Sequence, residues 1–359
     1  MITHFQTIII HFGYIKAVSV DFSPEKLELF SMLFSSRKMP ILGYIFLGSL
    51  ILLKAFQFQL STYATTGIFD NSEARSPFNF DLEFPLLPIQ NPRVQTIVLV
   101  NTVASEFELR DEIRASWANL TNSEKQDIKI EFMMGKPRPN QISLIRMEQE
   151  SFNDLIVANI TESYYSLSAK SMAMIIYKST YYKDTKCMVK ADSDNVLILR
   201  NFIRLCEESV APVILGKCDV PRAVLRNTTK WAVPYFVYSE PYFPQFCSTG
   251  TYVLAGAELP KLLINAAMLS PFATSQNYRR LSEDVMITGI LASKAGIHRR
   301  HLNGFSFFEI PEYFCRNSHK TTYSIHMVSN KNPSKYHYKM MQIEGKMCKW
   351  YDAFGVKRW

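Results

Sequence analysis

The chain lacks two sets of motifs that would place it in common functional classes. Its six cysteines form no Cys-x-x-Cys pair, which argues against a structural zinc site. It also has no basic helix, RNP-like aromatic motif or zinc finger, so we expect no nucleic-acid partner in spite of a net charge of +8. The remaining explanations for that charge are a membrane surface and anionic small molecules.

One apolar segment, residues 39–56 with an uncharged centre at 41–53, separates a short N-terminal region from the rest of the chain. Its length of about 18 residues is short for a membrane span but within the usual range. Arg37 and Lys38 stand immediately before it, which by the positive-inside rule keeps the N-terminus in the cytoplasm. No convincing small-x-small cleavage site follows it. We therefore expect a retained signal anchor; a buried helix and the core of a signal peptide are the alternatives.

This anchor divides the chain into regions of different composition, with no internal repeat among them. Residues 1–38 are expected to be a cytoplasmic tail, and residues 57–92, rich in Ser, Thr, Asn and Pro, a luminal stem. Residues 93–310 have the patterning of a globular domain, and residues 311–359 form a polar, basic and aromatic C-terminal extension.

Two features acquire meaning only if the chain enters the secretory lumen. Three Asn-x-Ser/Thr sequons begin at Asn119, Asn159 and Asn227, and each is a glycosylation acceptor only in that compartment. The even number of cysteines would likewise suit disulfides there, although the sequence does not give their pairing.

Strand and helix patterns alternate through the first half of the globular domain. Continuous apolar runs predict buried strands, and 3.6-residue periodicity predicts helices between them. This alternation indicates an α/β fold with a mostly parallel sheet and helices on both faces. Ligands in such sheets bind beyond the carboxyl ends of the strands. The expected strands are 96–101, 128–135, 154–158 and 187–190, and the expected helices are 106–119, 141–151, 164–178 and 259–269.

Two aspartates stand directly after the fourth strand. Asp192 and Asp194, separated by Ser193, can hold a hard divalent cation, which in turn can hold a diphosphate. The alternative is a solvated turn, because Asp-x-Asp is common by chance.

Five boxes in order resemble the β-1,3-glycosyltransferase family that holds the β-1,3-galactosyl- and N-acetylglucosaminyltransferases. The resemblance covers roughly residues 93–310. The boxes are Arg110-Asp-Glu-Ile113-Arg114-Ala-Ser116-Trp117, Phe132-Met-Met-Gly135, Asp154-Leu-Ile with Tyr164-Tyr-Ser-Leu167-Ser-Ala-Lys170, Lys190-Ala-Asp192-Ser193-Asp194 and Glu283-Asp284-Val285.

The resemblance implies a GT-A type nucleotide-sugar-binding domain and an inverting Golgi enzyme. Such an enzyme would be a single-pass type II membrane protein with a luminal catalytic domain, and would form a β-1,3 linkage to a glycan of a glycoprotein or glycolipid. Its donor would be a UDP-sugar carrying galactose or N-acetylglucosamine, held through Mn²⁺. The implied metal ligands are Asp192 and Asp194, with His301 as a further candidate; a surface position is the alternative for His301.

The resemblance also assigns residues to the nucleotide. Arg110 and Arg114 lie four apart on one helical face and are expected to contact the UDP moiety, because a planar guanidinium suits a phosphate. Asp154 and Lys170 are expected at the uridine or the wall of its pocket. The alternatives are salt-bridged surface positions for the arginines and a buried structural ion pair for Asp154 and Lys170.

Inverting transfer requires a base for the acceptor hydroxyl. Asp284 is the expected base, and Glu283 is expected to bind or orient the acceptor. A helix N-terminal carboxylate that accepts from backbone N–H groups is the alternative for Asp284.

The chain departs from the family pattern at Ser193, where the family has a third Asp, and in the aromatic segment 243–252. These departures leave the sugar open and motivate a second hypothesis, a non-catalytic luminal relative that binds or chaperones an active transferase. A third hypothesis, a soluble metal-dependent phosphatase or nuclease, would require residues 41–53 to be core.

Overall fold

The computed structural model describes part of the chain, in two units that we treat separately. The described residues are 6–11, 14–19, 76–121, 124–209, 212–218, 221–227, 231–306, 321–327, 332–343, 350–351 and 357–358. The first unit, residues 1–66, contains an antiparallel hairpin of β1 (Gln6–His11) and β2 (Tyr14–Ser19). The second unit, residues 67–359, carries everything discussed below.

The segment expected to be a membrane anchor, residues 39–56, lies outside the described residues. Within the described part of the chain, no helix has the length and apolar character needed to cross a bilayer.

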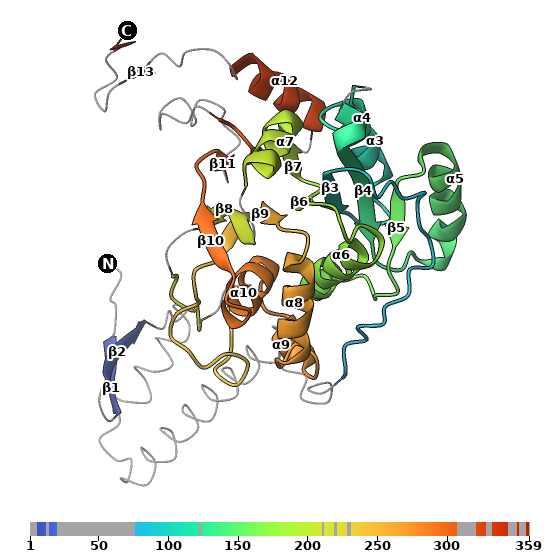
Figure 1. Ribbon diagram of the computed structural model, residues 1–359. Helices are drawn as coiled ribbons and strands as arrows, with labels where there is room; N and C mark the ends of the chain where they lie inside the picture. The colour runs from blue at the N-terminus through green and yellow to red at the C-terminus, as the bar shows by residue number, and fades with distance from the viewer. Residues whose placement is uncertain are drawn as a thin grey trace, which may run out of the picture. The chain divides into compact units, whose positions relative to one another are not determined.

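A seven-stranded sheet organises the second unit (Figure 1). Its strand order is β10-β8-β9-β6-β3-β4-β5. Each neighbouring pair is parallel except the two that include β9, so the expectation of a mostly parallel α/β sheet is confirmed. The strands are β3 (Thr96–Asn101), β4 (Ile128–Met134), β5 (Leu155–Val157), β6 (Cys187–Asp192), β8 (Val213–Cys218), β9 (Cys247–Ala255) and β10 (His298–His301).

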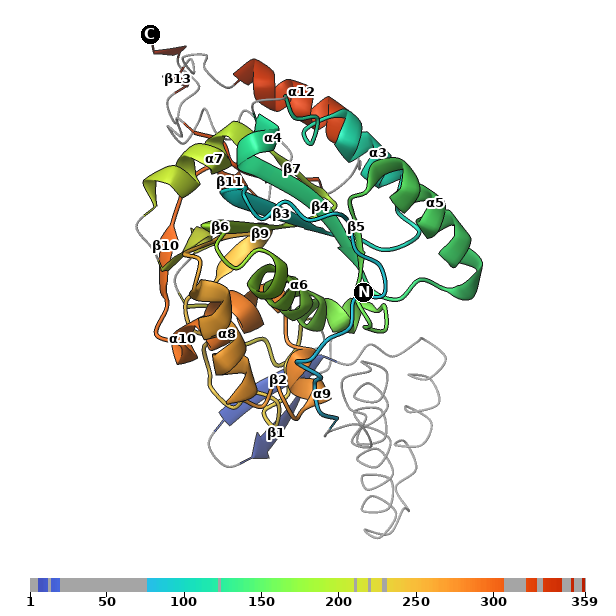
Figure 2. The ribbon, with the colours of Figure 1, turned by 45° about the vertical axis from the view of Figure 1, so that its right-hand side comes forward.

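Helices cover both faces of this sheet, as Figure 2 shows. The longer ones are α3 (Phe107–Ala115), α5 (Ile142–Phe152), α6 (Leu167–Tyr181), α7 (Leu199–Glu208), α8 (Leu259–Met268) and α12 (Pro333–Ile343). The short ones are α4 (Glu124–Asp127), η2 (Pro139–Gln141), η3 (Tyr164–Ser166), α9 (Gln276–Arg279), the π-helical segment η4 (Val285–Leu291) and α10 (Ala292–Lys294).

Each face of the sheet has its own hydrophobic core. Successive side chains of a strand point to opposite faces, so Ile97 and Leu99 of β3 enter one core while Val98 and Val100 enter the other. Helices α6 and α8 pack on the first face; α3 and α7 pack on the second. Because β3 is buried on both faces, its sequence is a continuous apolar run rather than an alternating one.

Residues after 310 join this fold. In a three-stranded sheet, β12 (Ser324–His326) lies between β11 (Phe305–Ser306) and β7 (Asn195–Leu197), antiparallel to β7. Ile325 and Met340 belong to the same core as β3. The described part of the region that we assigned to a C-terminal extension therefore shares the core of the globular domain.

Two disulfides hold the strands at the centre of the sheet. Cys187 of β6 is bonded to Cys206 of α7, and Cys218 of β8 is bonded to Cys247 of β9. The remaining two cysteines, Cys315 and Cys348, lie outside the described residues.

Candidate active site

Lys190 lies at the centre of a buried charged cluster near the carboxyl end of β6. Its ammonium Nζ is 2.7 Å from Asp192 Oδ1 and 3.0 Å from Glu283 Oε2, and it also donates to the carbonyl of Gly250 at 3.2 Å. Burial alone would lower the pKa of Lys190, but the charges of Asp192 and Glu283 raise it above its ordinary value. One ammonium thus connects the aspartate motif with the Glu-Asp-Val box, 90 residues further on.

Asp192 is held at the strand end by two further contacts. Asn101, the last residue of the adjacent strand β3, donates from Nδ2 to Asp192 Oδ1 at 3.2 Å. Gly250 lies directly against the carboxylate: a Cβ there would be 2.5 Å from Asp192 Oδ2, and its φ of +73° is in the left-handed region that favours glycine. Burial raises the pKa of Asp192, with the charges of Glu283 and Asp194 adding to the rise and Lys190 opposing it.

Ser193 makes a contact that an aspartate could not make as favourably. Its hydroxyl donates to Glu106 Oε2 at 2.9 Å, and the same carboxylate accepts from the Thr102 hydroxyl and the Val103 N–H. A second carboxylate at position 193 would repel Glu106. The replacement of the family's central aspartate by serine therefore fits its surroundings and leaves Asp192 and Asp194 in place.

His326 is the histidine that the structure brings to the aspartate motif. It ends β12, in register with Asn195 of β7, and its Nε2 is 3.4 Å from Asp194 Oδ2. Our sequence reasoning missed it, because it stands 132 residues beyond Asp194 and is aligned with it only by the pairing of two short strands. The residues around it, Ser324-Ile325 before and Met327 after, form no motif that marks a metal ligand.

His301 lies elsewhere. It ends β10, and its ring nitrogens are 3.2 Å from the Cys218 carbonyl and 3.1 Å from Asn303 Oδ1. Register places it opposite Gly216, then Tyr252, then Lys190. Three inter-strand spacings of about 4.8 Å put its backbone roughly 14 Å from that of Lys190. The structure therefore favours His326 over His301 as the neighbour of Asp194.

Among the described residues, no group of three or more His, Cys, Asp and Glu side chains is gathered closely enough to hold a metal ion. Asp192 faces Lys190 and Asn101, while Asp194 faces His326. The available donors are nevertheless carboxylate oxygens and one imidazole, a set that suits Mn²⁺.

Arg110 and Arg114 form a buried ion-pair network. Arg110 makes a bidentate contact to Glu148, at 2.7 Å and 2.6 Å, and its side chain has no exposed surface. Arg114 makes a bidentate contact to Asp154, at 2.8 Å through both oxygens, and also reaches Glu148. Both arginines are salt-bridged, as the alternative for them states, but Arg110 is fully buried and the Arg114 side chain is only 12% exposed, so neither lies at the surface. We correct the assignment of Arg110 from nucleotide contact to the joining of α3 with α5 and with the loop after β3, because its buried guanidinium is taken up by Glu148, the Thr102 hydroxyl and the Val103 carbonyl.

Asp154 and Lys170 do not pair with each other. Asp154 pairs with Arg114, whereas Lys170 Nζ is 2.9 Å from Glu162 Oε1 and donates to the Thr102 carbonyl at 2.8 Å. Burial lowers the pKa of Lys170, with the charges of Glu162, Asp192 and Glu106 opposing that shift. Lys170 therefore pairs with Glu162 and not with Asp154, the ion pair stated as the alternative.

Asp284 and Glu283 stand at the start of the helix that continues into η4. Glu283 accepts from the Tyr252 hydroxyl at 2.7 Å on the oxygen that does not face Lys190. Asp284 Oδ1 accepts from the Ser282 hydroxyl at 2.6 Å and from the Val285 N–H at 2.8 Å. Burial raises the pKa of Asp284, with the Glu283 charge adding to the rise, so its carboxylate is a stronger proton acceptor than an exposed one.

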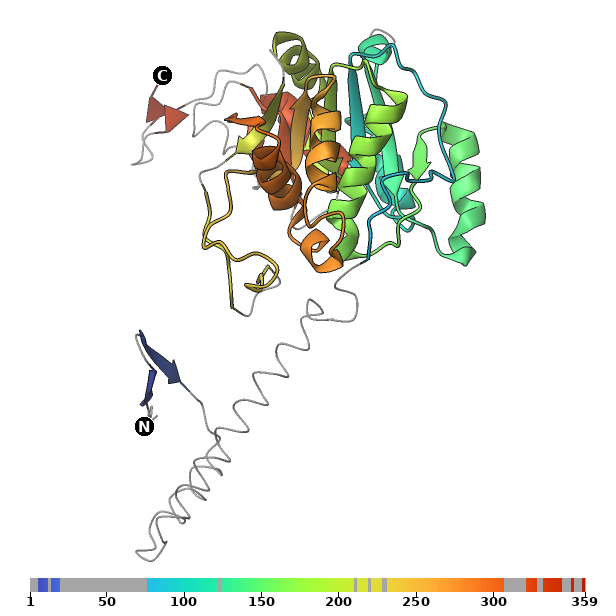
Figure 3. The same cartoon turned by 60° about the horizontal axis from the view of Figure 1, so that its bottom comes forward.

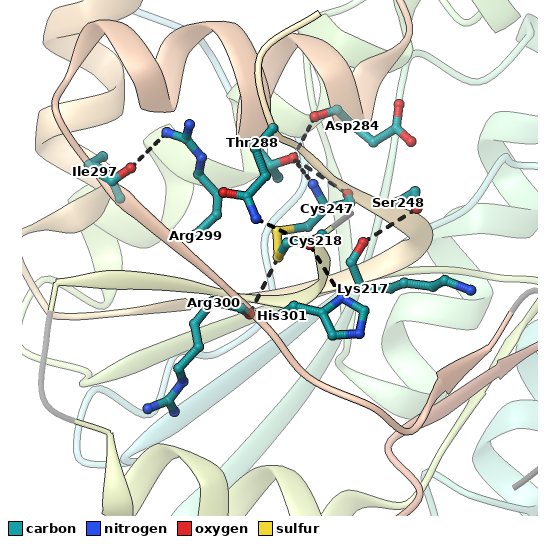
Figure 4. The surroundings of a disulfide bond; sticks show 11 residues. Lys217, Cys218, Cys247, Ser248, Asp284, Thr288, Ile297, Arg299, Arg300 and His301 are labelled. Atoms are coloured by element: carbon teal, nitrogen blue, oxygen red, sulfur yellow. Dashed lines mark hydrogen bonds between the residues drawn. A yellow bond between two sulfur atoms is a disulfide. The ribbon is translucent and has the colours of Figure 1, made fainter. Parts of the chain in front are cut away.

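A fully buried threonine connects Asp284 to the Cys218–Cys247 disulfide (Figure 4). The Thr288 hydroxyl accepts from the Cys247 N–H at 2.8 Å and donates to the Asp284 carbonyl at 2.6 Å. The disulfide in turn ties β9 to β8. The backbone of Asp284 is therefore positioned by contacts from β9 as well as by its own helix.

Comparison with known proteins agrees with this arrangement. A family model described as "Galactosyltransferase" matches residues 108–303, more than half of the 359 residues. Beta-1,3-galactosyltransferase 1 of Homo sapiens is 27% identical over 240 residues, which cover 65% of this chain and 70% of that protein. The human lactosylceramide 1,3-N-acetyl-beta-D-glucosaminyltransferase is 24% identical over 57% of this chain and 55% of its own length.

Similarity to solved structures is weaker. The galactosyltransferase LgtC, solved in complex with donor and acceptor sugar analogs, covers 69% of this chain and 94% of its own, with a TM-score of 0.37 and 7% identity. A similarity of that size does not decide the fold, which rests on the strand order above. The match of the family model, which spans β4 through β10 and includes both aspartate boxes, shows that the chain belongs to the galactosyltransferase family and is a glycosyltransferase.

Proposed function

We propose that this protein transfers a hexose, galactose or N-acetylglucosamine, from a UDP-sugar to a hydroxyl of a glycan on a glycoprotein or glycolipid, forming a β-1,3 linkage with inversion. The observation that carries the proposal is the Asp192–Lys190–Glu283 cluster. Through Glu283, the cluster joins the Asp192-Ser193-Asp194 motif, which suits a sugar nucleotide, to the adjacent Asp284, a carboxylate that suits the acceptor. Inverting transfer needs both in one site, on opposite sides of the anomeric carbon.

Asp284 is the proposed base. It would take the proton of the acceptor hydroxyl as that oxygen attacks the anomeric carbon, while UDP leaves from the opposite side. The Ser282 hydroxyl and Val285 N–H both bind Oδ1 and fix the carboxylate, which leaves Oδ2 for the acceptor. Its raised pKa suits this role, since proton transfer is most efficient when the base is close in pKa to the working pH.

Asp192, Asp194 and His326 are the residues that would hold Mn²⁺ in a GT-A type donor site. When bound, the ion would neutralise the charge that develops on the leaving diphosphate. Burial raises the pKa of Asp192, and Lys190 opposes that rise, because a neighbouring ammonium favours the charged carboxylate. Asn101 and Gly250 fix the direction of the same carboxylate.

A luminal position in the Golgi, behind a single type II anchor at residues 39–56, completes the proposal. Two disulfides in the described residues suit an oxidising compartment. Asn119, Asn159 and Asn227, which begin the three sequons, are all exposed and so accessible to glycan addition.

The test is a donor screen. The full-length protein is incubated with a panel of UDP-sugars and β-galactoside or β-N-acetylglucosaminide acceptors, with Mn²⁺ and with a chelator. We expect transfer from one or two UDP-sugars that the chelator abolishes, and the product linkage is determined by NMR. Full activity of the Asp192→Ala/Asp194→Ala double variant would refute the metal role.

The base has its own test. Asp284→Asn keeps the helix cap, because asparagine also accepts from backbone N–H groups. It should therefore lower transfer by about 10²- to 10⁴-fold while UDP affinity stays unchanged. Unchanged transfer would refute the base assignment. If calorimetry detects neither UDP nor Mn²⁺ binding by the wild-type protein, the non-catalytic luminal relative becomes the better description.

A further inference from the structure

We propose that Glu106 and Ser193 form a latch that fixes the loop after β3, residues 102–106, to the aspartate motif and so sets the affinity for the donor nucleotide. The inference rests on the proposed function and names two positioning residues on the donor side of that same site. The family resemblance assigns neither residue to the donor. Glu106 stands before the first box, and Ser193 departs from the family pattern.

Glu106 stands at the start of α3 but does not cap that helix. An N-cap side chain ordinarily accepts from the backbone N–H groups of the first helical turn, and in the described structure of α3 the Glu106 side chain makes no such bond. Its Oε2 accepts instead from three donors outside the helix: the Thr102 hydroxyl at 3.0 Å, the Val103 N–H at 3.3 Å and the Ser193 hydroxyl at 2.9 Å. One carboxylate oxygen therefore bonds both to the loop and to the motif.

Ser193 bonds the two ends of this loop. Its N–H donates to the carbonyl of Asn101, the last residue of β3, at 3.0 Å, and its hydroxyl donates to Glu106, where α3 begins. The strand β3, drawn in blue-green in Figure 3, lies beside β6, and the register pairs Asn101 with Asp192. Ser193, itself buried, thus closes the loop against the strand end that carries the motif.

Two buried cations attach the same loop to the rest of the domain. Lys170 Nζ donates to the Thr102 carbonyl at 2.8 Å, and Arg110 Nη1 donates to the Val103 carbonyl at 2.7 Å. These bonds do not involve Ser193. Loss of the Ser193 hydroxyl should therefore release the loop from the motif and leave it attached to the domain, so variants at this position should still fold.

The position of the loop connects the latch to the donor. Ligands of parallel sheets bind beyond the carboxyl ends of the strands, where this loop continues β3. Asn101, directly before the loop, donates to Asp192 Oδ1 at 3.2 Å. A nucleoside diphosphate with its phosphates at Asp192 and Asp194 would therefore meet the loop. A loop that is fixed in advance loses less conformational freedom on binding, which raises the affinity.

Calorimetry with UDP and Mn²⁺ on the full-length protein tests the latch. Ser193→Ala should raise the Kd for UDP by roughly ten-fold, the lower end of the effect of one lost hydrogen bond to a charged group. The KM for the UDP-sugar should rise in parallel, while the acceptor KM stays within about two-fold of wild type. Ser193→Asp should weaken UDP binding at least as much, because the new carboxylate would face Glu106.

A second change should rescue Ser193→Asp. In Glu106→Gln/Ser193→Asp, the amide nitrogen of the new glutamine can donate to the new aspartate, and its oxygen can still accept from Thr102 and Val103. The double variant should bind UDP within about three-fold of wild type, because changes in contacting residues are not additive. A double variant that binds UDP as weakly as Ser193→Asp would overturn the latch.

The matched control is Glu108→Gln/Ser193→Asp. Glu108 is exposed in the first turn of α3, so its replacement removes the same charge from the same end of the helix. This variant should remain as weak as Ser193→Asp. Equal rescue by Glu108→Gln and Glu106→Gln would trace the effect to overall charge and would overturn the latch.

Hydrogen exchange separates failure of the latch from failure of the proposed function. Exchange of the amides of residues 102–106 requires neither ligand nor turnover, and it should be faster in Ser193→Ala than in wild type. Unchanged exchange in Ser193→Ala would overturn the latch in a protein that transfers sugar. Faster exchange with weaker UDP binding would support the latch even in a protein that transfers none. Faster exchange with unchanged UDP affinity would show that the loop does not serve the donor, and the proposal would be wrong.

Discussion

The two sides of the central sheet are built differently. On the β3–β6 side, four consecutive strands are parallel and each successive pair is joined through a helical segment; β3, β4 and β5 lie side by side in chain order, and β6 lies on the other side of β3. On the β8–β10 side, β9 runs against its neighbours, a long loop precedes it, and the helix that carries Asp284 contains the π-helical segment η4. A disulfide joins β8 to β9.

The difference separates what supports the fold from what positions the proposed chemistry. The β3–β6 side buries charged residues in compact networks such as Arg110–Glu148, contacts that hold helices onto strands. On the β8–β10 side, single hydrogen bonds across irregular backbone orient Asp284. Apart from the Asp192 and Asp194 motif at the end of β6 and Glu106, which contacts that motif through Ser193, we therefore expect mutations on the first side to act mainly on stability and those on the second mainly on transfer.

The largest stability effect is expected at Glu148 of α5. Glu148→Gln removes the carboxylate that pairs with both Arg110 and Arg114, and the resulting uncompensated buried charge should cost about 3–5 kcal/mol of unfolding free energy. Chemical denaturation measures the loss. The control is Glu150→Gln on the same helix, where the side chain is exposed and the change should stay within about 0.5 kcal/mol. Equal stabilities of the two variants would contradict the network's role.

A second carboxylate on the same side, Glu131, should make stability depend on pH. It is fully buried and accepts from the hydroxyls of Tyr177 and Tyr182 at 2.8 Å each. Burial raises the pKa of Glu131 from 4.5 to about 7, and the two hydroxyls oppose the rise. Between those values the folded state keeps a proton that the unfolded chain releases, so stability falls as pH rises, by about 3 kcal/mol in total.

Glu131→Gln should remove that slope. The stability difference between wild type and Glu131→Gln should therefore change by about 3 kcal/mol between pH 4.5 and pH 7.5, as measured by urea unfolding at several pH values. Glu150→Gln again serves as the control and should leave the slope unchanged. Parallel pH curves for wild type and Glu131→Gln would show that Glu131 titrates normally.

On the opposite side, Thr288→Val tests the link to Asp284. Valine keeps the shape but leaves the Cys247 N–H and the Asp284 carbonyl without the hydroxyl between them. We expect a stability loss of about 1–3 kcal/mol and a fall in kcat of roughly ten-fold, because the backbone that carries the Asp284 carboxylate is no longer held from β9. The KM for the UDP-sugar should stay unchanged, and Thr288→Ser, which keeps the hydroxyl, should recover activity. A variant that loses stability but keeps wild-type kcat would confine Thr288 to a structural role.

The same contrast explains what the sequence could predict of the fold. Strands β3 to β6 were predicted to within a few residues, because each is a buried apolar run, followed by a helical pattern in β3, β4 and β5 and by the aspartate motif in β6. Strands β8, β9 and β10 were not predicted. Residues 298–301 of β10 are basic and largely exposed, and β9 contains a bulge with Thr249 and Gly250 at positive φ, so neither has the expected periodicity.

The candidate site shows the same limit. The positions of Asp192 and Asp284 follow from motifs of adjacent residues, and the structure joins them through Lys190. The partners of Arg110 and the approach of His326 to Asp194 depend on contacts 38 and 132 residues apart in the chain. A single sequence does not show which residues far apart in the chain lie opposite each other in the fold. The sequence therefore named charged residues of this region but did not give their partners.

The Cys218–Cys247 disulfide has a further consequence for the connection between β8 and β9. The bond closes a ring of chain between two positions 29 residues apart, so the strand ends stay fixed whatever the ring contains. Even without the bond, each doubling of the loop's length costs only about 0.6 kcal/mol of loop-closure free energy. Here the ends of the loop are already held by the disulfide. The ring can therefore be exchanged as a cassette. Replacing the segment between Cys218 and Cys247 with the corresponding segment of a relative would change which molecules bind there, while β8 and β9 remain unchanged.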